Sequence, residues 1–210
     1  MGPVSVTLAA ATAGPHAQPS LKAMFEARKR VFIDLLKWDV PVLDGRFEVD
    51  QFDNERAEYL IVGVRDGRHA ASARLLETTG PHILDSLFPQ LSATKPPRGS
   101  SVREITRFCR DPRVGALARR EARNVLVSAL VEHALANDIK TYTGVAEFGW
   151  YQQILAFGWR CRPLGLPQMV DGRMLGALAI EITAETPGLL AANGIHRPTE
   201  LAPLRALEAA

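Results

Sequence analysis

Apolar residues recur with helical spacing in two stretches of this chain. In residues 21–36 the apolar side chains share one broad helical face, which consists of Leu21, Met24, Phe25, Phe32, Leu35 and Leu36. Arg28 falls on the same face, and Ser20 precedes the stretch as a candidate helix cap. A second amphipathic helix is predicted over 114–138, with an apolar side made of Leu117, Val125, Leu126, Ala129, Leu130 and Leu135.

Strand patterns surround these helices. Residues 58–65 and 68–77 predict a hairpin, because the Asp66-Gly67 dipeptide between them is a strong turn signal. The other predicted strands are a short one at 4–8 and longer ones at 102–110, 139–146, 159–165 and 174–183. Short helices are predicted at 81–91, 147–158 and 187–193. This order of elements predicts the α/β class, with one mixed, twisted sheet and helices on both faces.

Residues 37–59 show neither the helical nor the strand period. They contain an Asp44-Gly45 turn, followed by four acidic residues between positions 48 and 55. A loop of this length inside a compact domain is usually functional or disordered. Aromatic residues such as Trp38 argue against disorder, so an ordered lid or binding loop is expected.

Composition indicates a soluble globular protein. The chain has 210 residues, of which 47% are hydrophobic and 23% charged, which predicts a single domain over 20–210 after a loose arm at 1–19. The net charge of +2 conceals acids crowded in 44–58 and arginines crowded in 103–123. That asymmetry favours an anionic or zwitterionic partner over a nucleic acid. No apolar run approaches the roughly 20 residues of a membrane span.

The numbers and spacing of cysteines and histidines argue against a disulfide framework and against a metal site. The two cysteines, Cys109 and Cys161, cannot build a disulfide framework, so a cytoplasmic protein is expected. The five histidines are scattered without metal-ligand spacing, and no metal is expected. No nucleotide-binding pattern of the Walker or Rossmann type occurs.

The predicted strand at 102–110 carries an unusual charge pattern, "REITRFCR". Strict alternation puts Glu104 and Arg107 on opposite faces unless a β-bulge intervenes, and such bulges are common beside active sites. Buried charges need partners, so the residues alone leave two interpretations open, a structural ion-pair network or a ligand site. For Arg28, the simpler alternative is an arginine that snorkels at the edge of the apolar stripe.

Ten residues in order carry a family resemblance. Arg28, Phe32 and Trp38 stand in "RKRVFIDLLKW", and Glu48, Asp50 and Asp53 in "EVDQFD". Arg74 follows in "SARLLETTGP", Phe88 in "LFP", and Glu104 and Arg107 in "REITRFC". Over residues 21–112 the chain resembles the acyl-homoserine-lactone synthases, the autoinducer synthases of quorum sensing. Beyond that range, "FGWRCRPLG" is only loosely similar.

The resemblance implies a fold, a reaction and two substrates. The fold would be an α/β/α sandwich related to the GNAT acetyltransferases, with a bulged central strand. The amine of S-adenosylmethionine would attack an acyl thioester, carried by acyl carrier protein or coenzyme A. The methionine carboxylate would then displace methylthioadenosine and close the lactone ring. S-adenosylmethionine would be a substrate, so no cofactor is expected.

The resemblance also implies catalytic roles on the central strand. Glu104 would be the base that removes the amine proton, or would orient a water, because a carboxylate on a strand is rigidly placed. Its structural alternative is to anchor an arginine. Arg107, with Arg28, would hold carboxylates, either those of the substrate or those of Glu104 and the acidic loop.

The remaining landmark residues are expected on the S-adenosylmethionine side. Asp50 and Asp53 would attract the cationic amine and sulfonium, or tether their loop to Arg74. The tether is expected for one of the two, and Glu48 would support these ion pairs.

The aromatic landmark residues also have two interpretations. Trp38 and Phe32 would pack on the adenine and, by cation–π attraction, on the sulfonium. For Phe32, core packing is the alternative.

The acyl pocket is expected from the second half of the chain. Its candidates are Phe88, Thr143, Val145, Phe148 and Trp150, each of which has ordinary core packing as the alternative. The bulk of Phe148, Trp150 and Tyr151 predicts a short, branched or aryl acyl group.

Basic residues after the central strand are candidates for binding the acyl donor. Arg113, Arg119, Arg120 and Arg123 would meet an acidic carrier protein or a coenzyme A phosphate, unless they form a solvated helix face.

Two other functions are considered. A GNAT-type N-acetyltransferase using acetyl-coenzyme A would need a glycine-rich loop after the central strand, whereas "RDPRVGALARR" supplies only Gly115 and has Pro112 in place of Arg or Gln. A non-catalytic S-adenosylmethionine-binding module would bind the ligand without releasing methylthioadenosine.

Overall fold

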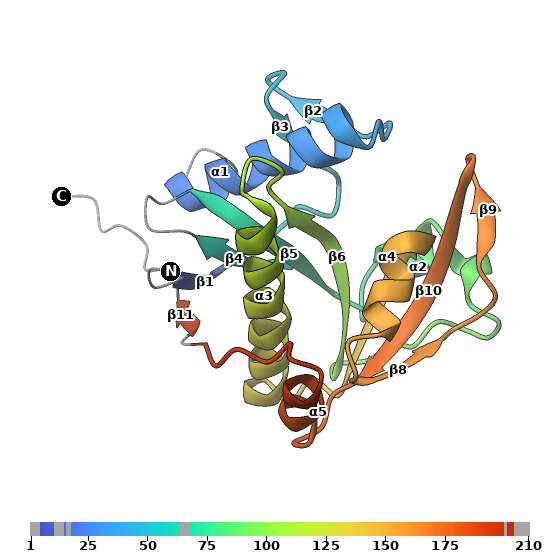
Figure 1. Ribbon diagram of the computed structural model, residues 1–210. Helices are drawn as coiled ribbons and strands as arrows, with labels where there is room; N and C mark the ends of the chain where they lie inside the picture. The colour runs from blue at the N-terminus through green and yellow to red at the C-terminus, as the bar shows by residue number, and fades with distance from the viewer. Residues whose placement is uncertain (1–4, 11–14, 16–17, 64–67, 200, 204–210) are drawn as a thin grey trace. The chain divides into compact units, whose positions relative to one another are not determined.

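The computed structural model describes residues 5–10, 15, 18–63, 68–199 and 201–203. The predicted Asp66-Gly67 turn and the start of the predicted strand at Val4 lie outside the described residues. The chain forms two compact units, the first from residues 1–74, 107–129 and 198–210, and the second from residues 75–106 and 130–197. The elements are labelled in Figure 1.

The first unit contains the following elements, three of which continue into the second. They are β1 (Ser5–Ala10), α1 (Pro19–Arg28), a π-helix η2 (Lys29–Leu35), β2 (Val42–Leu43), β3 (Phe47–Glu48), β4 (Ala57–Gly63), β5 (His69–Glu77), β6 (Val102–Arg110), α3 (Ala116–Ala136) and β11 (Leu201–Pro203). Strands β5 and β6 and helix α3 contribute residues to both units.

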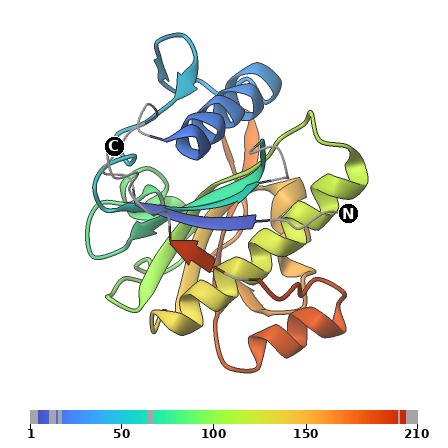
Figure 2. The ribbon, with the colours of Figure 1, turned by 90° about the vertical axis from the view of Figure 1, so that its left-hand side faces the viewer.

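Strand β1 lies between β11, to which it is parallel, and β4, to which it is antiparallel from Ser5 opposite Gly63 to Ala10 opposite Glu58. Figure 2 shows α1 on one face of β1 and β4 and α3 on the other. The loop predicted over 37–59 is ordered, and it contains the small antiparallel pair β2 and β3 beside α1.

The first predicted helix changes its winding half-way. After α1, the amide of Leu36 donates to the carbonyl oxygen of Val31 at 2.9 Å, and that of Trp38 to Phe32 at 2.8 Å. These wider turns rotate the apolar face, so Phe32 is buried while Leu35 is 61% exposed. The placement of Leu35 on the apolar face is therefore wrong. So is the cap at Ser20, because α1 begins at Pro19 and no side chain caps it.

The central strand β6 contains the phase shift expected from the sequence. Burial alternates from Val102 through Glu104 to Thr106, and then resumes one residue late at Cys109. Between these positions Arg107 has a left-handed φ of 50°. The shifted alternation and the positive φ are the features of a β-bulge.

Helix α3 buries the middle of its predicted apolar side and exposes the ends. Val125 and Leu126 are buried, but Leu117 and Leu135 are exposed because they lie in the first and last turns. Their placement on a buried face is wrong.

The second unit contains the remaining elements. They are α2 (Ile83–Ser86), a 3₁₀ helix η3 (Pro89–Leu91), β7 (Thr141–Glu147), α4 (Phe148–Leu155), β8 (Arg160–Pro163), β9 (Gln168–Val170), β10 (Arg173–Glu181) and α5 (Thr186–Ala192). Strand β10 pairs antiparallel with β7, β8 and β9, and β6 is parallel to β7 over 102–104.

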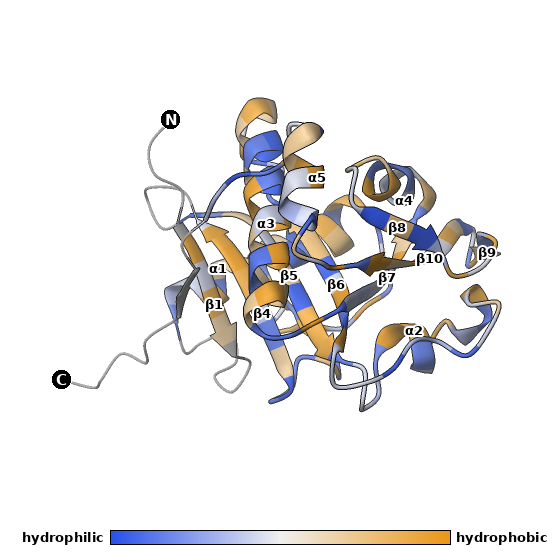
Figure 3. Ribbon diagram, turned by 90° about the horizontal axis from the view of Figure 1, so that it is seen from below, coloured by the Kyte–Doolittle hydropathy of each residue, from blue (hydrophilic) through white to orange (hydrophobic). Residues whose placement is uncertain are grey.

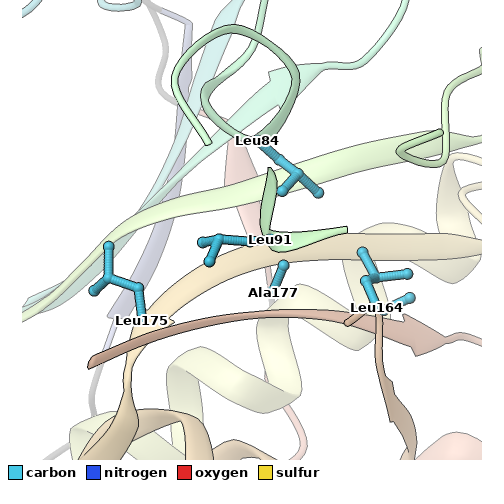
Figure 4. Packing of buried hydrophobic residues seen from close by; sticks show 6 residues of the cluster. Leu84, Leu91, Leu164, Leu175 and Ala177 are labelled. Atoms are coloured by element: carbon cyan, nitrogen blue, oxygen red, sulfur yellow. The ribbon is translucent and has the colours of Figure 1, made fainter. Parts of the chain in front are cut away.

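The two faces of β10 are covered by different helices. Leu175 and Ala177 pack in a core with Leu84 and Leu91, on the side of α2 (Figure 4). A Cβ on Gly176, which points the other way, would lie 2.7 Å from the Tyr151 ring of α4. Figure 3 shows α4 and α2 on opposite sides of β7 and β10.

The predicted fold class is confirmed, because each unit has sheet strands with helices on both faces. Strand β1 occupies part of the segment expected to be an arm, and the single domain over 20–210 stays a prediction. Among the described residues, no helix has the length and apolar character needed to cross a membrane.

Candidate functional site

Six buried charged side chains of the first unit form a closed ring in which positive and negative groups alternate. The ring comes from α1, β3 and the loop after it, β5 and β6, and its members in order are Arg28, Glu48, Arg107, Asp50, Arg74 and Asp53. All six are residues that the resemblance singled out.

Two arginines hold the acidic loop against α1 and β5. Arg28 donates from Nε to Glu48 at 2.6 Å, and from both Nη atoms to the two Asp53 oxygens at 2.7 Å. Arg74 Nη1 lies 2.6 Å from Asp50 Oδ1 and 2.7 Å from Asp53 Oδ1. Bidentate contacts of this kind fix direction as well as distance.

Arg107 closes the ring from the bulge of β6. Its Nη2 donates to Glu48 Oε1 at 2.9 Å and to Asp50 Oδ2 at 2.6 Å. Each guanidinium of the ring therefore contacts two carboxylates, and each carboxylate contacts two guanidiniums, so three positive charges balance three negative ones.

The opposite charges favour the ionised forms of Asp53 and Arg28 despite their burial. Burial alone would raise the pKa of Asp53, but Arg28 and Arg74 outweigh it and hold that pKa well below its usual value. Burial would lower the pKa of Arg28, but Asp53 and Glu48 raise it well above its usual value. Tyr59, which the sequence analysis missed, donates its hydroxyl to Asp53 at 2.8 Å. A tyrosine beside the acidic loop was the available signal, since a buried hydroxyl needs a partner.

An aromatic pair borders the ring at Arg107. The rings of Phe32 and Trp38 stack with centroids 4.7 Å apart, and the Arg107 guanidinium lies 5.5 Å from one and 5.7 Å from the other. The side chains of Arg107 and Asp50 are 9% and 6% exposed, whereas the other ring members are at most 1% exposed. The ring is thus most accessible where a cation and an anion are adjacent.

This geometry resolves two alternatives left open by the sequence. Arg28 does not snorkel, because its side chain is fully buried. Asp50 and Asp53 both act as tethers to Arg74, where a tether was expected of one of them.

Glu104 belongs to the second unit and holds a helix. Its carboxylate is fully buried and accepts the amide of Ile83 at 2.7 Å and the amide of Leu84 at 2.8 Å, at the start of α2. Backbone amides at a helix N-terminus stabilise an anion there. This contact could not be predicted from the sequence, because main-chain donors do not depend on residue type.

The acyl-pocket candidates are divided between two faces of the second unit. Thr143 lies opposite Ala179 in the β7–β10 register, and Val145 and Phe88 pack against the core cluster of Ala177 and Ala179. These three share the α2 side.

Phe148 and Trp150 belong to α4, on the opposite face, where they contact Tyr151 and Phe157. The expectation that the candidates from β7 and α4 face one pocket is wrong, because side chains of a strand alternate and α4 covers only one face.

The arginines after β6 differ in their surroundings. Arg113 donates to Asp111, 2.9 Å away, and this bond raises the pKa of Arg113. Burial and the neighbouring Arg119 lower the pKa of Arg110. Burial, Arg110 and Arg120 lower the pKa of Arg123. Positive charges therefore repel one another between the end of β6 and the first turns of α3.

Comparison with known proteins decides the family. The family model described as autoinducer synthase matches residues 15–186. This chain belongs to the autoinducer synthase family. The enzyme class expected from the ten landmark residues, an acyltransferase, is confirmed with it.

A curated relative and a solved structure show how far the likeness extends. An acyl-homoserine-lactone synthase from Ralstonia nicotianae is 31% identical over 179 residues, which are 82% of this chain and 87% of the relative. The solved structure of BjaI, a CoA-dependent acyl-homoserine lactone synthase with SAM and isopentyl-CoA, is 25% identical with a TM-score of 0.81. It covers 97% of this autoinducer synthase and 95% of its own chain.

A putative N-acetyltransferase from Lactobacillus plantarum is similar in fold alone. It is 17% identical, with a TM-score of 0.55 over 87% of this chain and all of its own. The expected relation to the acetyltransferase fold is confirmed.

Proposed function

We propose that this autoinducer synthase makes an N-acyl-homoserine lactone from S-adenosylmethionine and a coenzyme A thioester. The methionine amine attacks the thioester carbonyl, the C–S bond breaks, and the thiol leaves as the amide forms. The methionine carboxylate then attacks its own γ-carbon. The C–S⁺ bond breaks, and neutral methylthioadenosine leaves as the lactone ring closes.

The accessible corner of the ring is the observation that carries this proposal. An amino-acid headgroup has an ammonium and a carboxylate side by side, and the corner presents Asp50 and Arg107, 2.6 Å apart, in the matching order of charge. The carboxylate would compete for Arg107 and the ammonium for Asp50. Trp38 and Phe32 lie beside Arg107, where their π faces can attract the sulfonium by about 0.5 to 2 kcal/mol.

The four inner members of the ring have a different role. Their charges are already satisfied, so they fix the corner in place before substrate arrives. A preorganised corner of this kind orients the headgroup for both steps, which use its two ends in turn.

We propose that Glu104 accepts the proton that the amine loses, directly or through a water. The Ile83 and Leu84 amides of α2 hold the two oxygens of this carboxylate in a fixed direction, as a positioned base requires. Glu104 lies three residues before Arg107 on β6.

The function is tested by mixing the purified chain with S-adenosylmethionine and a panel of acyl thioesters. Isovaleryl-, benzoyl-, hexanoyl- and dodecanoyl-coenzyme A would be compared with the same acyl groups on acyl carrier protein. Mass spectrometry should detect methylthioadenosine and lactone in equal amounts. If neither product forms with any donor, the proposal is wrong. Acetylation without methylthioadenosine would point to an N-acetyltransferase instead.

The choice of coenzyme A rests on charge and on likeness. The cations of Arg110, Arg119, Arg120 and Arg123 repel one another, and a donor with several phosphates would relieve that repulsion. BjaI, which aligns over almost the whole chain, is CoA-dependent and was solved with isopentyl-CoA.

We therefore expect coenzyme A thioesters with short, branched acyl groups to be preferred. The Arg119→Ala/Arg120→Ala double variant should raise the KM for the donor and leave the KM for S-adenosylmethionine unchanged. Faster turnover with the carrier-protein thioesters would contradict this choice. Both cysteines are free thiols, in keeping with the proposed cytoplasmic site of action.

Glu104→Gln tests the proposed base. The variant should lose at least about a hundredfold in kcat, since general-base catalysis contributes that much or more. Because an amide NH₂ would face one of the two α2 amides, we also expect a loss of about 1 to 3 kcal/mol in the free energy of unfolding. Undiminished turnover in a folded variant would show that Glu104 only holds α2.

A further inference from the structure

The helix that holds the Glu104 carboxylate is itself weak. Helix α2 has four residues, too few to be stable by internal hydrogen bonds alone. The cap residue His82 makes no capping hydrogen bond with its own side chain, and the amides of Ile83 and Leu84 donate to Glu104 instead. The direction of the carboxylate therefore depends on how α2 is held.

Arg98 joins the two ends of the segment that carries α2. Its Nε donates to the carbonyl oxygen of Thr78 at 3.0 Å, and its Nη2 to that of Thr79 at 3.1 Å. Its Nη1 donates to Asp85 of α2 at 3.1 Å. One planar guanidinium thus binds the chain as it leaves β5 and the helix that follows.

A second set of contacts fixes the chain around Arg98. The buried hydroxyl of Thr78 accepts the amide of Gly99 at 3.1 Å and lies 3.0 Å from the carbonyl oxygen of Val102. Gly99, which follows Arg98, and Thr78, whose carbonyl oxygen Arg98 binds, are therefore tied to the start of β6, the strand that carries Glu104.

We propose that Arg98 is a positioning residue for Glu104 and acts through α2. The inference rests on the proposed function, because it requires that Glu104 takes part in acyl transfer. Without Arg98, Ile83 and Leu84 still anchor α2 by their buried side chains, so the chain folds. The segment that carries their amides, however, loses the contacts that Arg98 makes at Thr78, Thr79 and Asp85, so the amides are held less firmly against the carboxylate.

Steady-state kinetics of Arg98→Ala test the coupling. We expect kcat for methylthioadenosine release to fall by about tenfold to a hundredfold, with the KM for S-adenosylmethionine unchanged. The acidic limb of the pH–rate profile should move to higher pH, because amide donors favour the ionised carboxylate. Arg98→Lys should recover only part of the rate, since it keeps the charge beside Asp85 but not the planar fork. Arg160→Ala is the matched control, as Arg160 is an exposed arginine paired with Glu185 in the same unit, and it should keep wild-type rates.

A double-mutant cycle and hydrogen exchange separate positioning from general damage. If Arg98 acts through Glu104, adding Arg98→Ala to Glu104→Gln should change the rate by less than about twofold. Peptide 80–88 should exchange its amides faster in Arg98→Ala but not in Arg160→Ala.

Two results would overturn the proposal in distinguishable ways. Full activity of Arg98→Ala beside an inactive Glu104→Gln would overturn this inference alone. Full activity of Glu104→Gln would overturn the proposed role of Glu104 and this inference with it, while exchange in peptide 80–88 would still report whether Arg98 holds α2.

Discussion

Burying any one charged side chain of the ring without its neighbours would cost free energy, and the opposite charges around it offset that cost. A guanidinium such as Arg28, buried without carboxylates, would lose its hydration and gain nothing in return. With Glu48 and Asp53 at 2.6 and 2.7 Å it has both charge and hydrogen bonds satisfied. A complete buried ring therefore adds little net stability and mainly positions its residues. Removing one member should nevertheless lower the free energy of unfolding, because it leaves buried charges uncompensated.

Replacing Arg28 tests that cost directly. Arg28→Ala leaves Glu48 and Asp53 buried with one arginine each, so we expect a loss of about 3 to 5 kcal/mol in the free energy of unfolding by urea. Arg46→Ala is the control, because Arg46 pairs with Glu26 at the surface and should cost less than about 1 kcal/mol. Equal losses of unfolding free energy in the two variants would show that Arg28 contributes no more to stability than a surface ion pair does.

At the scale of elements, the hydrophobic period predicted most helices and strands but not their local irregularities. The helix over 21–36 exists, yet its π turns, which no residue type marks, expose Leu35. The three residues of β9 were too few to show a period, and β11 is equally short. The bulge at Arg107 was expected from the family resemblance, whereas the alternation of residues alone left it open.

The end of α4 gives a prediction at this scale. Gly158 has a φ of +93°, and a Cβ there would lie 1.9 Å from Asn193 Nδ2 and 3.1 Å from the Leu189 carbonyl oxygen. Gly158→Ala should therefore destabilise the chain by about 1 to 3 kcal/mol. Gly149→Ala, inside α4 with open space around it, should instead stabilise by up to about 1 kcal/mol. Thermal unfolding of the two variants would reveal a wrong account if both moved in the same direction.

At the scale of the whole molecule, residue order predicted which charges meet, although their pairing needed the structure. The ring residues are spread over 28–107 in the chain, and the resemblance named all of them without saying which contacts which. Which carboxylates each arginine contacts depends on side-chain directions, and the spacing of residues along the sequence does not determine these directions. The faces of the acyl-pocket candidates were missed for the same reason.

Stability should depend on pH through a group outside the ring. The ring carboxylates Asp50 and Asp53 have lowered pKa values, so their contribution is lost only as pH falls below about 4. His69 differs: burial lowers its pKa to about 4, against the opposing attraction of Asp111. Since the unfolded chain takes up this proton near pH 6.5, stability is complete above that pH and falls as pH drops to 4, by up to about 3 kcal/mol.

His69→Gln should flatten this slope, because glutamine can still bond Ser72, which lies 2.9 Å from His69 Nε2, but cannot titrate. Urea unfolding at pH 7, 6, 5 and 4.5 would measure the slope, with His196→Gln as a control that should retain it. Among the described residues, His69 is the group whose lowered pKa places its proton uptake on unfolding between pH 4.5 and 6.5. A His69→Gln variant with the wild-type slope would therefore mean that another group binds the proton when the chain unfolds.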